Sequence, residues 1–225
     1  MAAGLSLVAG GGTNAPSDQA TSLPAPERPT LSELFPASAR DGGATGFLLA
    51  HVARGKPLLW VQERMAMIEA GRIYPPGLGM SDLIHVTARD ARAALWAMEE
   101  GLRCSALGAV IGEVWGDPKA LDFTATRRLA VAAERYGVAA FLIRLGGHPN
   151  LSGARMRWRV ASAPSLANAL DPKAPGTAAW EAELFRARGF APGKWIVSHE
   201  KSADRLSVVA AAVDRTLVEG ERRVG

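Results

Sequence analysis

Several residue types and patterns are scarce in this 225-residue sequence, and each scarcity excludes a class of protein. Cysteine occurs once, as Cys104, which excludes an intramolecular disulfide and a cysteine-based zinc site. This usage is typical of the reducing cytoplasm. No run approaches the roughly 18 consecutive apolar residues of a membrane span, and the first residues make a poor signal peptide. The sequence therefore predicts a cytoplasmic protein that has no contact with a membrane.

Lysine is also scarce, with five residues against 21 arginines, and none of them lies in a Gly-Lys-Ser/Thr motif. In a phosphate-binding loop that lysine reaches the phosphates and the hydroxyl binds Mg²⁺. Residues 33–50 nevertheless have the layout of such a loop, which is a strand, a glycine-containing turn and a helix. We therefore predict a nucleotide-hydrolase scaffold without the chemistry of hydrolysis. The residues of this degenerate loop are Arg40, Asp41, Gly42, Gly43, Thr45 and Gly46.

Between residues 31 and 145 the sequence alternates short apolar runs with segments of helical periodicity. One apolar stripe runs from Ala91 to Leu102, and a second helix is expected from Asp122 to Tyr136, ended by Gly137. Short runs that are apolar on both faces suit buried parallel strands. The alternation predicts an α/β fold with helices on both faces of the sheet. The expected strands are residues 58–61, 83–86, 107–111 and 138–143.

The segments outside this alternation differ in composition. Residues 1–30 are rich in small residues and proline, which predicts a flexible N-terminal segment. Beyond residue 150, polar and apolar residues alternate, which predicts antiparallel strands that extend the sheet. These strands are expected at residues 157–160, 180–188 and 194–199.

Residues 201–225 form a tail with an apolar repeat at helical spacing. The repeat predicts an amphipathic helix, which either binds in the groove of a partner or packs on its own domain. The residues that would bind the partner are Leu206, Val209, Val213 and Leu217.

Residues at strand ends are candidates for a site, because open parallel sheets bind ligands beyond the carboxyl ends of their strands. Glu113 follows a buried apolar run; it would hold Mg²⁺ or orient water in a hydrolase, or it is an ordinary strand-end carboxylate. An ATPase that grips phosphate through Arg40 and Glu113 stays open as an alternative. His85 lies within an apolar run, which favours a core histidine. Further polar residues at strand ends are Gln62, Glu63, Thr87 and Arg144.

The histidines do not have the spacing of zinc ligands, and the sequence contains no Gly-x-Ser-x-Gly motif. No catalytic residue, metal or cofactor is therefore predicted. Two Arg-x-Arg pairs lie on strands expected to be neighbours, close to several tryptophans. They form a platform for phosphate or single-stranded DNA, or they line the solvent face opposite Glu181 and Glu183 while the tryptophans fill the core. The four arginines are Arg157, Arg159, Arg186 and Arg188.

Five segments in this order resemble the ImuA family of bacterial damage-inducible mutagenesis proteins, which are distantly similar to RecA and to the cell-division inhibitor SulA. The resemblance covers about residues 31–200. It implies a RecA-like three-layer α/β/α core whose mostly parallel sheet is extended by C-terminal antiparallel strands. The segments are residues 74–78, 95–103, 109–113, 121–129 and 157–160.

The resemblance also implies a function. It points to a non-catalytic adaptor of SOS-induced mutagenic translesion DNA synthesis, with ImuB, an error-prone DNA polymerase III alpha homologue and RecA as partners. It offers no catalytic motif, and it leaves direct contact with DNA open. The alternatives are a SulA-like inhibitor of the cell-division protein FtsZ and a RecA-like ATPase with a non-standard phosphate site.

Overall fold

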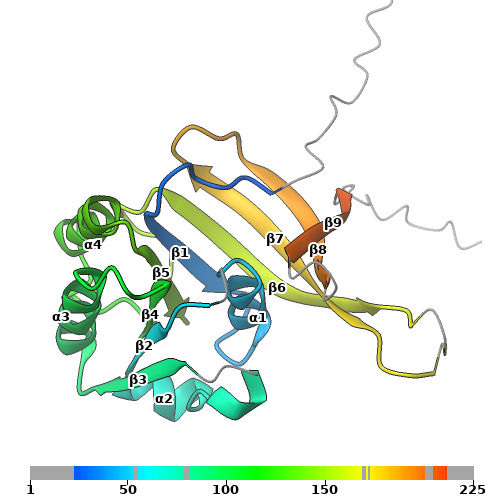
Figure 1. Ribbon diagram of the computed structural model, residues 1–225, viewed down its shortest axis with the longest axis horizontal. Coiled ribbons are helices and arrows are strands. Elements are labelled where there is room, and N and C mark those ends of the chain that lie inside the picture. Colours follow the sequence, from blue (N-terminus) through cyan, green and yellow to red (C-terminus); the bar gives the residue numbers. More distant parts are fainter. Residues whose placement is uncertain are drawn as a thin grey trace, which may run out of the picture.

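Among the residues that the structure describes, nine strands form one mixed sheet in the order β3-β2-β4-β5-β1-β6-β7-β8-β9 (Figure 1). The computed structural model describes residues 23–52, 55–78, 82–168, 171, 173–200 and 205–211. Neighbouring strands from β3 to β6 are parallel. These parallel strands are β1 (Leu31–Pro36), β2 (Leu58–Glu63), β3 (Leu83–Ala88), β4 (Ala109–Trp115), β5 (Ala139–Leu145) and β6 (Met156–Leu166).

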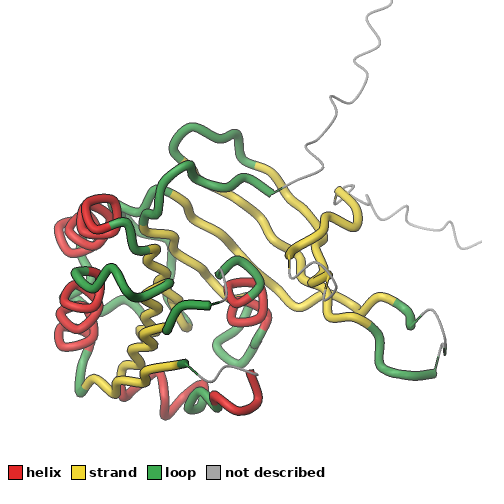
Figure 2. The backbone as a smooth tube through the Cα atoms, viewed as in Figure 1, coloured by secondary structure: helices red, strands yellow, loops and turns green. Residues whose placement is uncertain are grey.

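Helices cover both faces of the parallel part of the sheet (Figures 1 and 2). Helices α3 (Ala91–Leu102) and α4 (Phe123–Tyr136) bury one apolar core against it. Helices α1 (Gly43–Leu49) and α2 (Arg64–Ala70) lie over the opposite face, where they join a second core. This three-layer arrangement confirms the predicted α/β class and is consistent with a RecA-like fold.

The two long helices lie where the apolar stripe and the periodic segment of the sequence predict them. Asp90 and Asp122 cap α3 and α4, each accepting a hydrogen bond from the amide three residues on, at 2.8 and 2.7 Å. Helix α4 ends at Gly137, which adopts the left-handed conformation at φ 70°. Apolar burial along one stripe then fixes each helix to the sheet.

The C-terminal strands extend the sheet, as predicted. Strands β7 (Thr177–Ala187) and β8 (Gly193–Glu200) follow β6 in antiparallel pairing. Trp180, Ala182 and Leu184 point into the second core, whereas Glu181 and Glu183 lie on the opposite face. The period-two alternation therefore places the residues of β7 correctly.

The described part of the C-terminal tail does not form the predicted helix. Residues Arg205–Ala211 form strand β9, which pairs antiparallel with β8. Leu206 and Val208 pack against the second core while Val209 is exposed, so the period is two. The free edge of β8 supplies backbone partners, and the valines favour extended backbone. The other two residues of the expected helix face lie outside the described residues: Val213 and Leu217.

One end of the sheet is also less buried than predicted. Strand β3 is an edge strand, and Ile84 and His85 on it are at least partly exposed. Helix α2 and the short 3-10 helix η1 (Pro75–Leu78) lie between β2 and β3 in the chain, and the sequence analysis did not predict them. Seven- and four-residue helices carry too little periodicity to be recognised.

Candidate functional site

The degenerate loop and Glu113 meet in one cleft of about 140 Å³ at the carboxyl ends of the strands. The loop leads from β1 into α1, and Glu113 lies on β4. Of the predicted loop residues, Gly43, Thr45 and Gly46 lie within α1 rather than in the loop itself. The lining also contains residues that were not predicted for this site, among them Arg72. The predicted residues that line the cleft are Arg40, Asp41, Gly42, Thr45 and Glu113.

The carboxylate of Asp41 occupies the start of helix α1. It accepts hydrogen bonds from the amide of Gly43 at 2.8 Å and from the amide of Ser162 at 3.0 Å. Burial raises the pKa of Asp41, but these amides and the Ser162 hydroxyl together outweigh it, so the pKa lies below its usual value. Asp41 is therefore a fixed negative charge at the place where a phosphate loop holds its anion.

Close packing explains why two of the predicted loop residues, Gly43 and Gly46, are glycine. A Cβ on Gly43 would lie 2.7 Å from the amide nitrogen of Ser162 on β6. A Cβ on Gly46 would lie 2.7 Å from the ring of Trp180 on β7. Helix α1 therefore approaches the extended part of the sheet closely, and these two glycines need no ligand to account for them.

Glu113 is buried and both of its oxygens are occupied. Oε1 accepts from the indole of Trp60 at 2.8 Å, and Oε2 accepts from the amide of Gln62 at 2.7 Å. Burial raises the pKa of Glu113, and the bonds from Gln62 and Trp60 offset that rise only in part. Within the described ranges, no group of three or more His, Cys, Asp and Glu residues could hold a metal ion. The geometry favours the ordinary strand-end carboxylate among the two predicted roles.

Gln62 connects the cleft to the edge of the sheet. Its oxygen accepts from the amide of Ile73 at 3.0 Å and from Nε2 of His85 at 2.9 Å. His85 is thus a half-buried histidine on an edge strand, and the prediction of a core histidine was wrong. Burial lowers the pKa of His85, and the nearby Arg72 lowers it further. Because the oxygen of Gln62 can only accept, the ring donates to it from Nε2.

Replacing Glu113 by glutamine tests this network. The new amide nitrogen faces a donor in either orientation, because Trp60 and Gln62 both donate, so we expect a loss of about 1–3 kcal/mol in the free energy of unfolding.

The stability that Glu113 contributes should also depend on pH. Its raised pKa means that the folded protein holds the carboxyl proton of Glu113 more tightly than the unfolded protein does. Stability from Glu113 is thus full below the unfolded pKa and is lost as pH rises through the folded pKa. In urea denaturation from pH 4 to 8, the stability of wild type relative to Glu113→Gln should fall as pH rises; a difference that does not change with pH contradicts the assignment.

The four arginines of the two Arg-x-Arg pairs do not form one platform. Arg157 is buried, and its Nε binds Glu33 at 2.7 Å. Arg159 pairs with Glu183 at 3.3 Å, as the solvent-face alternative predicts. Arg186 and Arg188 are exposed near the end of β7, where the groove beside α4 begins. The tryptophans close to these pairs, Trp158, Trp180 and Trp195, lie in the core.

The sequence did not predict a buried ionic cluster that joins strands β1, β5 and β6. Arg144, which was expected only as a strand-end residue, contacts Glu33 at 3.5 Å and Asp117 at 2.6 Å. Arg144 and Arg157 both lie over the ring of Phe35. Glu33 stands between two apolar residues on one face of β1, and a charge in such a strand signals a buried partner.

The fold and this cleft define an α/β protein of RecA-like architecture whose phosphate-loop position is filled by its own Asp41. No family model matches the chain. Over 189 residues it is 33% identical to protein ImuA from two strains of Caulobacter vibrioides, NA1000/CB15N and ATCC 19089; the alignment covers 76% of this chain and 74% of those proteins. The chain therefore belongs to the ImuA family, the family of damage-inducible mutagenesis proteins that its motifs resemble. No helix in the described ranges is long and apolar enough to cross a membrane.

Proposed function

We propose that this protein is a non-enzymatic adaptor of SOS-induced mutagenic translesion DNA synthesis in the cytoplasm. The observation that carries the proposal is membership of the ImuA family. As partners we propose ImuB, an error-prone DNA polymerase III alpha homologue and RecA. An adaptor needs binding surfaces and no catalytic centre.

The cleft beside α1 supports a role without nucleotide hydrolysis. A phosphate that entered it would meet the charged Asp41 at the start of the helix, and the sequence supplies no Gly-Lys-Ser/Thr lysine to attract it. Glu113 has both oxygens engaged by Trp60 and Gln62. The hypothesis of an ATPase that uses Arg40 and Glu113 therefore lacks a free acid in this cleft.

The edge of the sheet at β3 supports a role in protein binding. Four large apolar side chains are 43–69% exposed on α2, on β3 and just before η1. By its register with Leu59, Ile84 faces the side of the first core, whereas α2 lies over the opposite face, so these side chains border both sides of the free edge. Exposed apolar residues beside a free strand edge are typical of a protein-binding surface. We call this group the β3-edge patch; it consists of Met65, Ile68, Tyr74 and Ile84.

Co-purification from DNA-damaged cells tests the proposal. Wild-type protein should retain at least one of the three partners, and the double variant Ile68→Glu/Ile84→Lys should lose it because the changes place charges in the β3-edge patch. Leu151→Glu is the matched control, since Leu151 is 68% exposed elsewhere on the surface. Failure to retain any of the three partners, with and without single-stranded DNA, would contradict the adaptor role.

A deletion strain separates the adaptor from the SulA-like alternative. Loss of damage-induced mutagenesis is the result expected of an adaptor. Filamentation on overproduction, together with unchanged induced mutagenesis in the deletion strain, would indicate an inhibitor of FtsZ instead.

A further inference from the structure

A groove of about 390 Å³ lies between helix α4 and the end of β7. Arginines line it from three directions: Arg127 from α4, Arg155 from the segment before β6, and Arg186 and Arg188 from β7 and the residue after it. The ring of Phe123 also lines the groove and is 41% exposed. The groove thus combines planar cations with an accessible aromatic ring.

Positive charge is in excess in this groove. Arg155 is bound by Glu134 at 2.6 Å, and Arg188 also attracts that carboxylate. In the part of the chain that the structure describes, Arg127 and Arg186 form no ion pair, and both are exposed. Solvated arginines that have no acidic neighbour favour an anionic ligand.

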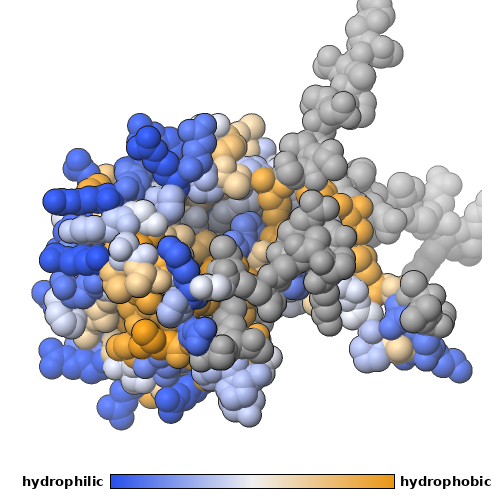
Figure 3. Space-filling model, in the orientation of Figure 1, coloured by the Kyte–Doolittle hydropathy of each residue, from blue (hydrophilic) through white to orange (hydrophobic). Residues whose placement is uncertain are grey.

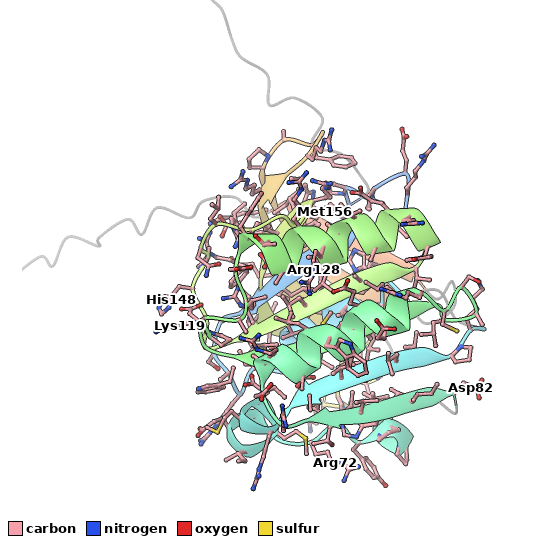
Figure 4. The ribbon with its side chains drawn as sticks, turned by 90° about the vertical axis from the view of Figure 1, so that its left-hand side faces the viewer. Arg72, Asp82, Lys119, Arg128, His148 and Met156 are labelled. Atoms are coloured by element: carbon pink, nitrogen blue, oxygen red, sulfur yellow. The ribbon has the colours of Figure 1, made fainter. Side chains whose placement is uncertain are left out.

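A second groove of about 370 Å³ lies on the other side of Arg127, between α3 and α4. Arg103, Arg128 and Arg135 line it together with the ring of Tyr136. Arg128 lies between the two helices (Figure 4) and is paired with Glu99, while the guanidinium of Arg135 stands 5.5 Å over the Tyr136 ring. The outer surface of both helices is hydrophilic (Figure 3).

We propose that the two grooves form one binding surface for single-stranded nucleic acid, with the phosphates on the arginines and bases against Phe123 and Tyr136. Arginine forks match phosphate oxygens, and the exposed ring of Phe123 and the partly exposed ring of Tyr136 can accept unpaired bases, which a duplex does not offer. The fourteen residues of α4 span about 21 Å. At about 3.4 Å per nucleotide this length corresponds to about six nucleotides.

This surface differs from the platform that the Arg-x-Arg pairs suggest. Arg157 is buried against Glu33, and Arg159 lines neither of the two grooves. Only Arg186 and Arg188 of those pairs belong to the surface. The other arginines of the surface were not predicted from the sequence; most of them come from α4, where Arg127 lines both grooves.

Fluorescence anisotropy with a labelled 20-mer oligothymidylate tests the proposal on the full chain. Arg127→Glu/Arg186→Glu should weaken binding by about tenfold or more. The control Arg64→Glu/Lys173→Glu makes the same change in net charge at exposed positions outside the two grooves and should bind as wild type does. Thermal unfolding of both double variants verifies that they fold.

Salt and competitors complete the test. The logarithm of affinity should fall with the logarithm of salt at a slope of about −0.7 per phosphate contacted, or about −4 for six phosphates. Tighter binding of a matched duplex would overturn the proposal, and so would equal weakening by the two double variants. Polyglutamate of equal charge should compete poorly with the labelled oligonucleotide. If it competes as strongly as unlabelled oligonucleotide, and its binding is lost in Arg127→Glu/Arg186→Glu, the grooves bind an acidic protein segment and the proposal is wrong.

Discussion

Replacing Glu33 by alanine is expected to lower the free energy of unfolding by about 3–5 kcal/mol. Glu33 is fully buried, and its two oxygens contact Arg144 and Arg157, which are buried as well. Arg144 Nε and Arg157 Nη2 already have no hydrogen-bond partner in the described structure. Without the carboxylate, Arg157 keeps its charge inside the sheet with no ion pair, and that uncompensated charge makes the loss large.

Glu183→Ala is the matched control for this change. Glu183 also pairs with an arginine of β6, Arg159, but both side chains are partly exposed, so the expected loss is under about 1 kcal/mol. Urea denaturation followed by circular dichroism measures both variants at neutral pH. Should Glu33→Ala fail to fold, Glu33→Gln keeps the volume and should lose stability in the same direction. Equal losses for the Glu33 and Glu183 variants would contradict the buried cluster.

The second large effect is expected at Gly43, where alanine should destabilise the fold by about 1–3 kcal/mol. The added Cβ would lie 2.7 Å from the Ser162 amide nitrogen and 3.0 Å from the Ala161 carbonyl carbon. Both atoms are backbone of β6, so helix α1 itself has to move. The movement would also disturb the hydrogen bonds from Ser162 and Gly43 to Asp41.

The neighbouring residue provides the control for this prediction. A Cβ on Gly42 would meet nothing within 4 Å, and its φ of −68° suits any residue. Gly42→Ala should therefore be neutral or stabilise the fold by up to about 1 kcal/mol. Thermal unfolding measures both variants. If Gly42→Ala lowers the melting temperature as much as Gly43→Ala does, the packing of α1 on β6 is not the reason for glycine at position 43.

Patterns local in sequence predicted most of the fold. The apolar stripe from Ala91 to Leu102, the segment from Asp122 to Tyr136 and the stop at Gly137 predicted the two long helices, and apolar runs predicted the buried strands. The prediction for the tail was wrong because Leu206 and Val209 have the spacing of one helix face, whereas Leu206 and Val208 share one face of a strand, and only the free edge of β8 selects the strand. Tertiary pairing decides such ambiguous segments.

The site was predictable only in part, for the same reason. The missing lysine and the position of Asp41 were visible in the sequence, and the structure brings that loop to Glu113 in one cleft. Partners that are distant in sequence were not visible: Glu33 and Arg157 are separated by 124 residues. An arginine pattern alone therefore does not distinguish the buried Arg157 from the exposed Arg186.

The central claim is that this ImuA-family protein keeps a recombinase-like scaffold while its own Asp41 takes the place of a bound phosphate. Calorimetric titration of the full chain with Mg-ATP up to about 1 mM, near the upper range of enzyme KM values, tests it most directly. We expect no saturable heat and no release of phosphate. Saturable binding or turnover in wild type, abolished by Arg40→Ala or Glu113→Gln, would contradict it.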